Sequence, residues 1–302
     1  MHLSRCLNLV AIATLPCAPA LAQSLPFGLQ PEGHFSLGYT NRTPGAEMFL
    51  FGDANLRLGV DSFASGVPLG LELGLFGLAT GLDTPHETYG ALTWDPASGA
   101  RILIGVPRPA YDSFAISAIE RHFPTLGIDR TATTRSVMTD GAMFGGFLPY
   151  GVRFQNATNG LDYALSYHDA SNADMRAASL GLGYQMGNWT LSGAVEVAWA
   201  RTTEVSAKAQ ASGQIGPVTA GLGLYLPGAT GAPDTAAAFA AFSPLDRLTV
   251  SGAIQVPLDD TTDPTAGLAI RYAAGRRVDV SLGVASDAGA AASLSAFVDF
   301  RF

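Results

Sequence analysis

Hydrophobic side chains along most of this chain recur at every second position. From residue 69 to residue 75, leucines at the odd positions alternate with Gly70, Glu72 and Gly74. Residues 161–167 (LDYALSY) repeat the pattern, with leucine and tyrosine on one face and small or polar residues on the other. A period of two places successive side chains on opposite faces of a strand. The pattern therefore predicts β-strands with one apolar face and one small or polar face.

The alternating runs number sixteen, and each is about 8 to 12 residues long, the length that a tilted strand needs to cross a bilayer. An even number of strands brings the two termini of the chain to the same side of the membrane, and closure leaves no strand edge in lipid. The predicted fold class is all-β, a transmembrane antiparallel β-barrel. Its predicted strands are 33–41, 50–62, 67–80, 87–94, 100–107, 147–156, 160–169, 175–186, 188–199, 202–214, 216–227, 234–243, 246–256, 263–274, 276–287 and 290–302.

A soluble β-sandwich also alternates, but two features favour the membrane barrel. The second face carries Ser, Thr, Gly, Gln and charged residues in almost every strand, which suits a water-filled lumen. Aromatic residues stand near strand ends, where interfacial girdles are expected. We therefore predict the outer membrane of a Gram-negative cell. The aromatic residues in question are Tyr39, Trp189, Trp199, Tyr272 and Phe302.

The N-terminus has the pattern of a cleaved secretory signal. Arg5 supplies the positive charge, residues 7–15 the apolar run, and residues 20–22 (ALA) the cleavage site. The run is too short for a transmembrane anchor, which needs about 20 apolar residues. A lipoprotein signal ending before Cys17 is disfavoured, because Pro16 stands where a small residue is required. We predict a signal peptide at 1–22 and a barrel at 23–302.

Composition limits the chemistry of the exported chain. Both cysteines, Cys6 and Cys17, lie in the predicted signal, which leaves no thiol nucleophile or cysteine-based metal site. The formal net charge is −8, which disfavours nucleic acid as a partner. No histidine accompanies a lipid-facing serine, as a barrel phospholipase would require. We expect no enzymatic activity, no cofactor and no metal. Asp259, Asp260 and Asp263 form an acidic turn that we interpret as solvated, with weak binding of a divalent cation as the alternative.

One connector, residues 108–146, is far longer than the usual loop of about 4 to 6 residues. It is too apolar for a disordered segment. We therefore expect it to fold into the lumen and to narrow it. Connectors after even-numbered strands are tight turns and are placed in the periplasm, whereas those after odd-numbered strands are usually longer and are placed outside. The apolar residues of the long connector are Phe114, Ile116, Ile119, Phe123, Leu126, Ile128, Met138, Met143 and Phe144.

Four segments carry a family resemblance. Residues 102–112 (ILIGVPRPAYD) look like a fifth strand that runs into a constriction loop. Residues 150–156 (YGVRFQN) and 161–167 (LDYALSY) look like the next two strands. Residues 294–302 (LSAFVDFRF) are similar to the C-terminal strand by which the barrel assembly machinery recognises its clients. In these features the chain resembles the general porins of Gram-negative bacteria, especially those of alphaproteobacteria.

The resemblance implies a trimer of pores, each narrowed by the third external loop, for passive diffusion of small hydrophilic solutes and ions. It implies acidic residues on the loop, here Asp112, Glu120, Asp129 and Asp140. It also implies basic residues on the opposite wall, here Arg57, Arg153 and Arg271. Phe300 and Phe302 would form the assembly signal. The implied partners are outer-membrane lipids and lipopolysaccharide, the assembly machinery and further copies of the chain.

Two other kinds of barrel remain as alternatives. A channel specific for one class of solute would differ from a general porin only in the lining of its lumen. A structural or secretory barrel, such as an autotransporter translocator, would need a helix through the pore and a passenger upstream. Loop arginines such as Arg108, Arg121, Arg130 and Arg135 would offset the loop acids, so the ion preference is not assigned from the sequence.

Overall fold

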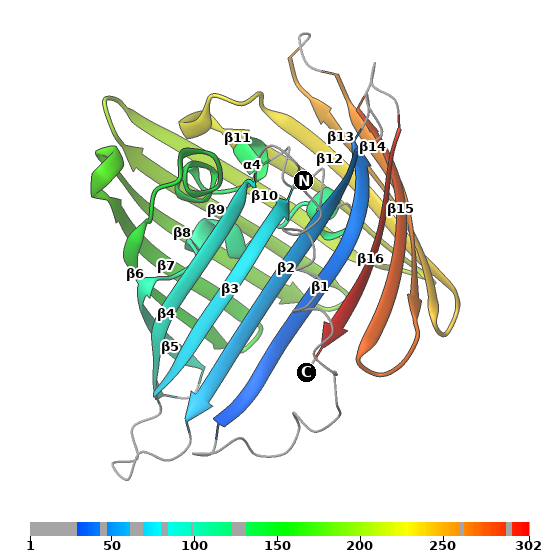
Figure 1. Cartoon of the computed structure of the whole chain (residues 1–302), viewed down its shortest axis with the longest axis horizontal. Helices are drawn as coiled ribbons and strands as arrows, with labels where there is room; N and C mark the ends of the chain where they lie inside the picture. The colour runs from blue at the N-terminus through cyan, green and yellow to red at the C-terminus, as the bar shows by residue number, and fades with distance from the viewer. Residues whose placement is uncertain are drawn as a thin grey trace, which may run out of the picture.

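The computed structural model describes residues 29–42, 47–60, 69–79, 84–97, 99–122, 131–259, 263–287 and 292–301. These residues form a closed barrel of sixteen strands in which every neighbouring pair is antiparallel and β1 pairs with both β2 and β16 (Figure 1). The predicted fold class is thus confirmed. The predicted signal peptide, residues 1–22, lies outside the described residues. The strands are β1 (Leu29–Arg42), β2 (Glu47–Val60), β3 (Leu69–Ala79), β4 (His86–Ala97), β5 (Ala100–Val106), β6 (Tyr150–Thr158), β7 (Leu161–Ala170), β8 (Met175–Met186), β9 (Trp189–Trp199), β10 (Thr203–Ile215), β11 (Val218–Pro227), β12 (Thr235–Leu245), β13 (Leu248–Pro257), β14 (Thr265–Ala273), β15 (Val278–Asp287) and β16 (Ser293–Arg301).

The two faces of the barrel wall reverse the arrangement of a soluble protein. Large apolar side chains point outward and are exposed, as in Leu92 at 68% and Leu222 at 67%. The inward positions of the same strands carry buried polar residues, among them Ser166, Glu196 and Lys208. An outward apolar band around a polar interior is the arrangement of outer-membrane barrels. The period-2 pattern therefore reflects an apolar outer face and a polar inner face of the wall.

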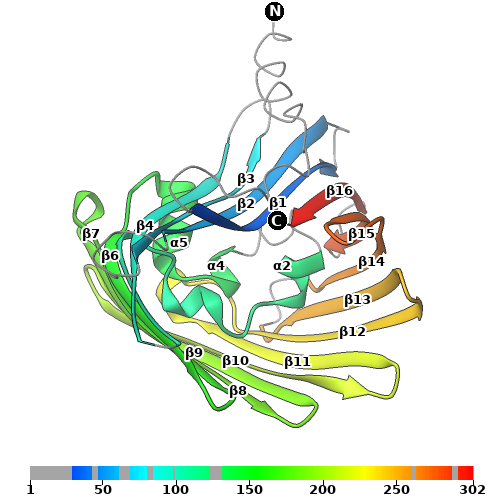
Figure 2. The same cartoon turned by 90° about the horizontal axis from the view of Figure 1, so that it is seen from below.

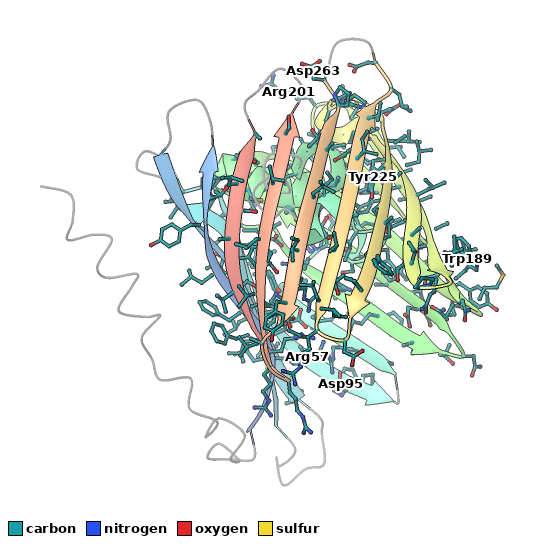
Figure 3. The ribbon with its side chains drawn as sticks, turned by 90° about the vertical axis from the view of Figure 1, so that its right-hand side faces the viewer. Arg57, Asp95, Trp189, Arg201, Tyr225 and Asp263 are labelled. Carbon is teal, nitrogen blue, oxygen red and sulfur yellow. The ribbon has the colours of Figure 1, made fainter. Side chains whose placement is uncertain are left out.

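Exposed aromatic side chains mark both ends of this band. Tyr39, Tyr150, Tyr167 and Trp199 stand at the end that bears the long connectors. Trp94, Tyr184, Trp189 and Tyr272 stand at the end that bears the short turns. Figure 3 gives landmarks for these ends, with Arg201 and Asp263 at the long-connector end and Asp95 at the short-turn end. Phe302 lies outside the described residues.

The short turns owe their shape to residues that accept left-handed backbone angles. Between β6 and β7, Asn159 has φ +50° and Gly160 has φ +77°, while Thr158 and Leu161 are directly paired. Two successive residues with positive φ match the right-handed twist of the flanking strands, and Asn-Gly is the sequence that adopts them most readily. This turn therefore fixes the register of β6 against β7.

The connector between β5 and β6 contains short helical segments that lie inside the ring of strands (Figure 2). The remaining helical turns, η5 (Ser171–Ala173) and η6 (Gly228–Thr230), follow β7 and β11. Among the described residues, no helix is both long enough and apolar enough to span a membrane. The segments of the long connector are η3 (Ala110–Ser113), α2 (Ala118–His122), α4 (Thr131–Thr134), α5 (Val137–Asp140) and the π-helical turn η4 (Gly141–Gly145).

Candidate functional site

The long connector, called the lumen loop below (residues 107–149), begins by lying along the inner faces of β7, β8 and β9. The amide of Ala110 donates to Ser166 Oγ at 2.8 Å. The amides of Tyr111 and Ala115 donate to Ser179 Oγ at 3.4 Å and to Ser192 Oγ at 3.2 Å. Inward serines thus accept hydrogen bonds from the first amides of η3, which the helix itself leaves unpaired, and from the amide of Ala115 beyond it. The start of the loop is held against the wall as a consequence.

Two basic side chains of the wall bind the same stretch. Arg153 on β6 donates from Nη1 to the carbonyl of Arg108 at 3.0 Å and to Ser113 Oγ at 2.8 Å. His168 on β7 donates from Nε2 to the carbonyl of Pro107 at 2.9 Å. Both side chains are buried. The predicted wall residue Arg153 therefore meets the loop, and it does so through carbonyl and hydroxyl oxygens.

Asp112 joins the first part of the lumen loop to the last. Its carboxylate accepts from the amide of Ser136 at 2.6 Å and from the hydroxyl of Thr139, and only 2% of the residue is exposed. Ser136 is the N-cap of α5, and its side chain accepts from the amide of Met138. A cap residue satisfies an amide that the helix leaves unpaired. Asp112 thus fixes the position of α5 within the lumen.

Glu196 on β9 and Lys208 on β10 hold the middle of the loop. Glu196 accepts from Ser136 Oγ at 2.6 Å and from the amide of Val137 at 2.9 Å. Lys208 donates to the carbonyl of Thr134 at 2.7 Å, and its Nζ lies 4.4 Å from the ring centroid of Tyr111. Hydrogen bonds to charged groups are about twice as strong as those between neutral groups. These two buried side chains therefore attach the middle of the loop to the wall through hydrogen bonds of this stronger kind.

Glu120 is paired within the loop itself. Its carboxylate lies 2.7 Å from Nε of Arg135, whose guanidinium lies 5.5 Å from the ring centroid of Phe76. Burial alone would lower the pKa of Arg135, but the charges of Glu120 and Asp112 outweigh it and raise that pKa above its ordinary value. Arg135 is therefore a permanent cation, and its charge offsets that of Glu120.

Apolar contacts seat the loop on two separate parts of the wall. Ala118 and Ile119 of α2 pack on Ala253, Ala269 and Ala285, which are inward residues of β13, β14 and β15. On the other side, Val137, Met138 and Phe147 pack on Ala170, Ala177 and Ala198 of β7, β8 and β9. Small strand residues leave room for these contacts. The loop therefore crosses the lumen from one wall to the other.

The loop packs closely on the wall at Gly181 on β8. A Cβ atom at this position would lie 2.0 Å from the ring of Phe114, whereas one at Gly183 would lie 3.4 Å from that ring. The first distance is a severe overlap and the second an ordinary contact. The ring of Phe114 therefore occupies the space that a side chain at position 181 would need.

The part of the wall formed by β14–β16 and β1–β3 carries ion pairs between its own strands. Arg57 on β2 lies 3.7 Å from Glu72 on β3. Arg271 on β14 and Arg301 on β16 both pair with Asp279 on β15. Arg57 and Arg271 thus stand near the short-turn end, as Figure 3 shows for Arg57, and Arg153 is the predicted wall residue that the structure brings to the loop.

The other predicted residues have mixed positions. Asp140 ends α5, and burial raises the pKa of its carboxyl. Phe300 lies on β16 and pairs with Phe35 and Val278. Asp129 and Phe302 lie outside the described residues. The constriction and assembly roles of these residues remain predictions.

The sequence interpretation missed the residues that attach the loop. Glu196 and Lys208 were not singled out as site residues, nor was Glu87 on β4, which lies 3.1 Å from Arg108. Each occupies an inward position of a strand. The sequence signal for these residues was a long charged side chain on a face that otherwise carries small or neutral polar residues. Such a side chain indicates a specific partner inside the lumen.

Comparison with known proteins identifies the fold. No family model and no curated protein matches this sequence. Two mutant forms of the porin of Rhodopseudomonas blastica each superpose with a TM-score of 0.67 at 17% identity, covering 91% of this chain and 100% of theirs. A structure from work on asymmetric conductivity of engineered proteins gives a TM-score of 0.66 at 18% identity, with 91% of this chain and 100% of the other covered. The chain therefore has the fold of porins.

Proposed function

We propose that the protein is an outer-membrane porin, a water-filled channel for passive diffusion of small hydrophilic solutes and ions. One observation carries the proposal. The lumen loop is hydrogen-bonded to inward residues of β6–β10 and packs through α2 on β13–β15, while inward arginines on β2, β14 and β16 keep between a third and a half of their side chains exposed. A lumen that the loop crosses but in which these charges stay exposed fits a narrowed aqueous passage better than a solid plug.

The outward face supports the location. A continuous band of exposed leucine, valine and isoleucine between two aromatic girdles is stable against lipid and would aggregate in water. The proposal includes export by a signal at residues 1–22, cleavage before Gln23, and insertion by the barrel assembly machinery through Phe300 and Phe302. It also includes a homotrimer in contact with lipids and lipopolysaccharide, and it assigns no catalytic role.

The charged residues predicted at the constriction are proposed to act in two ways. Asp112, Glu120 and Arg153 set the position of the loop, because their partners belong to the loop or hold it. Arg57 and Arg271 line the passage, because they are partly exposed on inward positions of the wall. Asp129 and Asp140 are proposed to face the passage from the loop.

Conductance of the purified protein in planar bilayers tests this function. We expect discrete conductance steps, and we expect larger steps after deletion of residues 115–140, because this deletion removes α2, α4 and the contacts of Glu196 and Lys208. The control is Arg201→Gln, at an exposed position at the long-connector end of the barrel, and it should leave the step size unchanged. Absence of any channel would refute the porin, and an unchanged step after the deletion would refute the role of the loop.

A further inference from the structure

Two arginines bind one carboxylate at the short-turn end of β14, β15 and β16. Arg271 donates from Nε to Oδ2 of Asp279 at 3.0 Å and also from Nη2, and Arg301 donates from Nη2 to the same oxygen. Asp279 is buried at 1% exposure, whereas the side chains of Arg271 and Arg301 are 46% and 49% exposed. Each guanidinium carries five N–H groups. All three of these hydrogen bonds reach Oδ2 of Asp279, so N–H groups of both half-exposed arginines remain available to a ligand.

The balance of charge around this pair is positive. Asp299, which is paired with Asp279 across β15 and β16, accepts a hydrogen bond from Ser36 at 2.7 Å. The turn between β14 and β15 adds exposed Arg276 and Arg277, and the carbonyl of Arg277 accepts from the amide of Arg301. The short-turn end of β14–β16 thus carries four arginines and two aspartates, in a chain whose formal net charge is −8. Local cationic excess in an acidic protein favours an anionic ligand.

The pair also lies next to the loop. Ala269, which seats Ile119 of α2, is the preceding inward residue on β14. Two residues along a strand span about 7 Å. A solute that has passed the loop therefore meets Arg271 and Arg301 next on its way to the short-turn end.

We infer that Arg271 and Arg301 form an anion-binding site of the channel, with small oxyanions such as phosphate and carboxylates as its ligands. The inference rests on the proposed function and assigns its solute class. A guanidinium fork matches the geometry of an oxyanion and binds it by two parallel hydrogen bonds. Asp279 fixes the two forks side by side and withdraws part of their charge. Binding is consequently weak enough for release, which conduction requires.

The test uses inorganic phosphate and the full chain, and it measures both the binding of phosphate and its effect on conductance. We expect phosphate to bind the detergent-folded protein and to reduce its KCl conductance in bilayers. The double variant Arg271→Gln/Arg301→Gln should weaken phosphate binding by about tenfold and shift the reversal potential in a KCl gradient toward cations. Low salt is needed because the Debye length is only about 10 Å at 0.1 M.

A matched control removes two positive charges at the opposite end, through Arg176→Gln/Arg201→Gln. It should retain phosphate binding and reversal potential. Equal losses in both double variants, or no phosphate binding by the unaltered chain, would overturn the anion site. Conductance without phosphate binding rejects the site and leaves the channel standing. Phosphate binding that is lost in the first variant, without any conductance, supports the site and rejects the channel.

Discussion

Two parts of the barrel wall are built from the same alternating pattern and differ in what their inward polar residues meet. On β7–β10, Ser166, Ser179, Glu196 and Lys208 are buried and bind the lumen loop. On β14–β16, the inward arginines bind Asp279 and remain half exposed. The polar residues of the first part are enclosed by the loop, whereas the two arginines of the second part remain in contact with water. Equal polarity therefore does not imply equal function, and substitutions should separate the two.

The largest effect is expected from Glu196→Ala on the loop-bearing wall. Loss of the carboxylate leaves the hydroxyl of Ser136 and the amide of Val137 without their partner, and hydrogen bonds to charged groups contribute about 1.5–3 kcal/mol each. We expect the free energy of unfolding to fall by about 3 kcal/mol, measured by denaturant titration of the detergent-folded barrel. Glu204→Ala, at an exposed position on β10, is the control.

The same variant has a chemical readout. Lys208 is the only lysine of the chain and is 5% exposed, so acylation of its amine should be slow in the folded protein. Release of the loop in Glu196→Ala should accelerate this acylation, followed by mass spectrometry of the peptide. Equal acylation rates in Glu196→Ala and Glu204→Ala would show that Glu196 does not hold the loop.

A smaller effect is expected from Gly181→Ala, which places a methyl group against the ring of Phe114. Overpacking of this kind costs about 1 to 3 kcal/mol. Gly183→Ala on the same strand is the matched control, because its methyl group would make an ordinary contact with that ring. Thermal unfolding of both variants decides the question, and equal midpoints would contradict the close seat of Phe114.

On β14, Arg271→Gln should change stability by less than Glu196→Ala does, because Arg301 still pairs with the buried Asp279 and compensates its charge. We expect the exchange to change the ion preference of the channel instead, measured as a shift of the reversal potential in a KCl gradient. The comparison between the walls fails if this exchange destabilises the barrel as much as Glu196→Ala does.

The smallest effect concerns pH. Burial raises the pKa of the Asp140 carboxyl, so the folded loop holds this proton more tightly than the unfolded chain does. The stability that this proton contributes is complete below the ordinary carboxyl pKa and is lost as pH rises through the raised value. Asp140→Asn should abolish this decline in unfolding titrations at successive pH values, whereas Asp246→Asn in an exposed turn should retain it.

The fold was predictable because a barrel wall repeats one rule at every strand. Period-2 alternation identified all sixteen strands, and the bounds of β8 agree with the predicted range 175–186. The turn between β6 and β7 is tighter than the predicted turn at 156–160, because the pairing continues to Thr158 and Leu161. The strand ends differ by a few residues where turn geometry decides them. One such case is β1, which begins at Leu29 and continues the alternation past the polar Glu32.

The site was predictable only in part, because alternation assigns a face and does not say what the face touches. Alternation assigns Arg153 to the polar face of β6, but its partners depend on the path of the loop. The meeting of Arg271 with Arg301 depends on the register of three strands, which the sequence of any one strand does not contain. Glu196 and Lys208 became loop attachments for the same reason.

The seat of Ile119 on Ala253, Ala269 and Ala285 constrains the order of folding. These alanines belong to β13, β14 and β15, which are synthesised long after the loop. Contacts of such large sequence separation form late, since the intervening chain must first be brought together. The loop therefore completes its docking only when the last strands pair with the first. A fully attached loop is consequently a marker of a closed barrel.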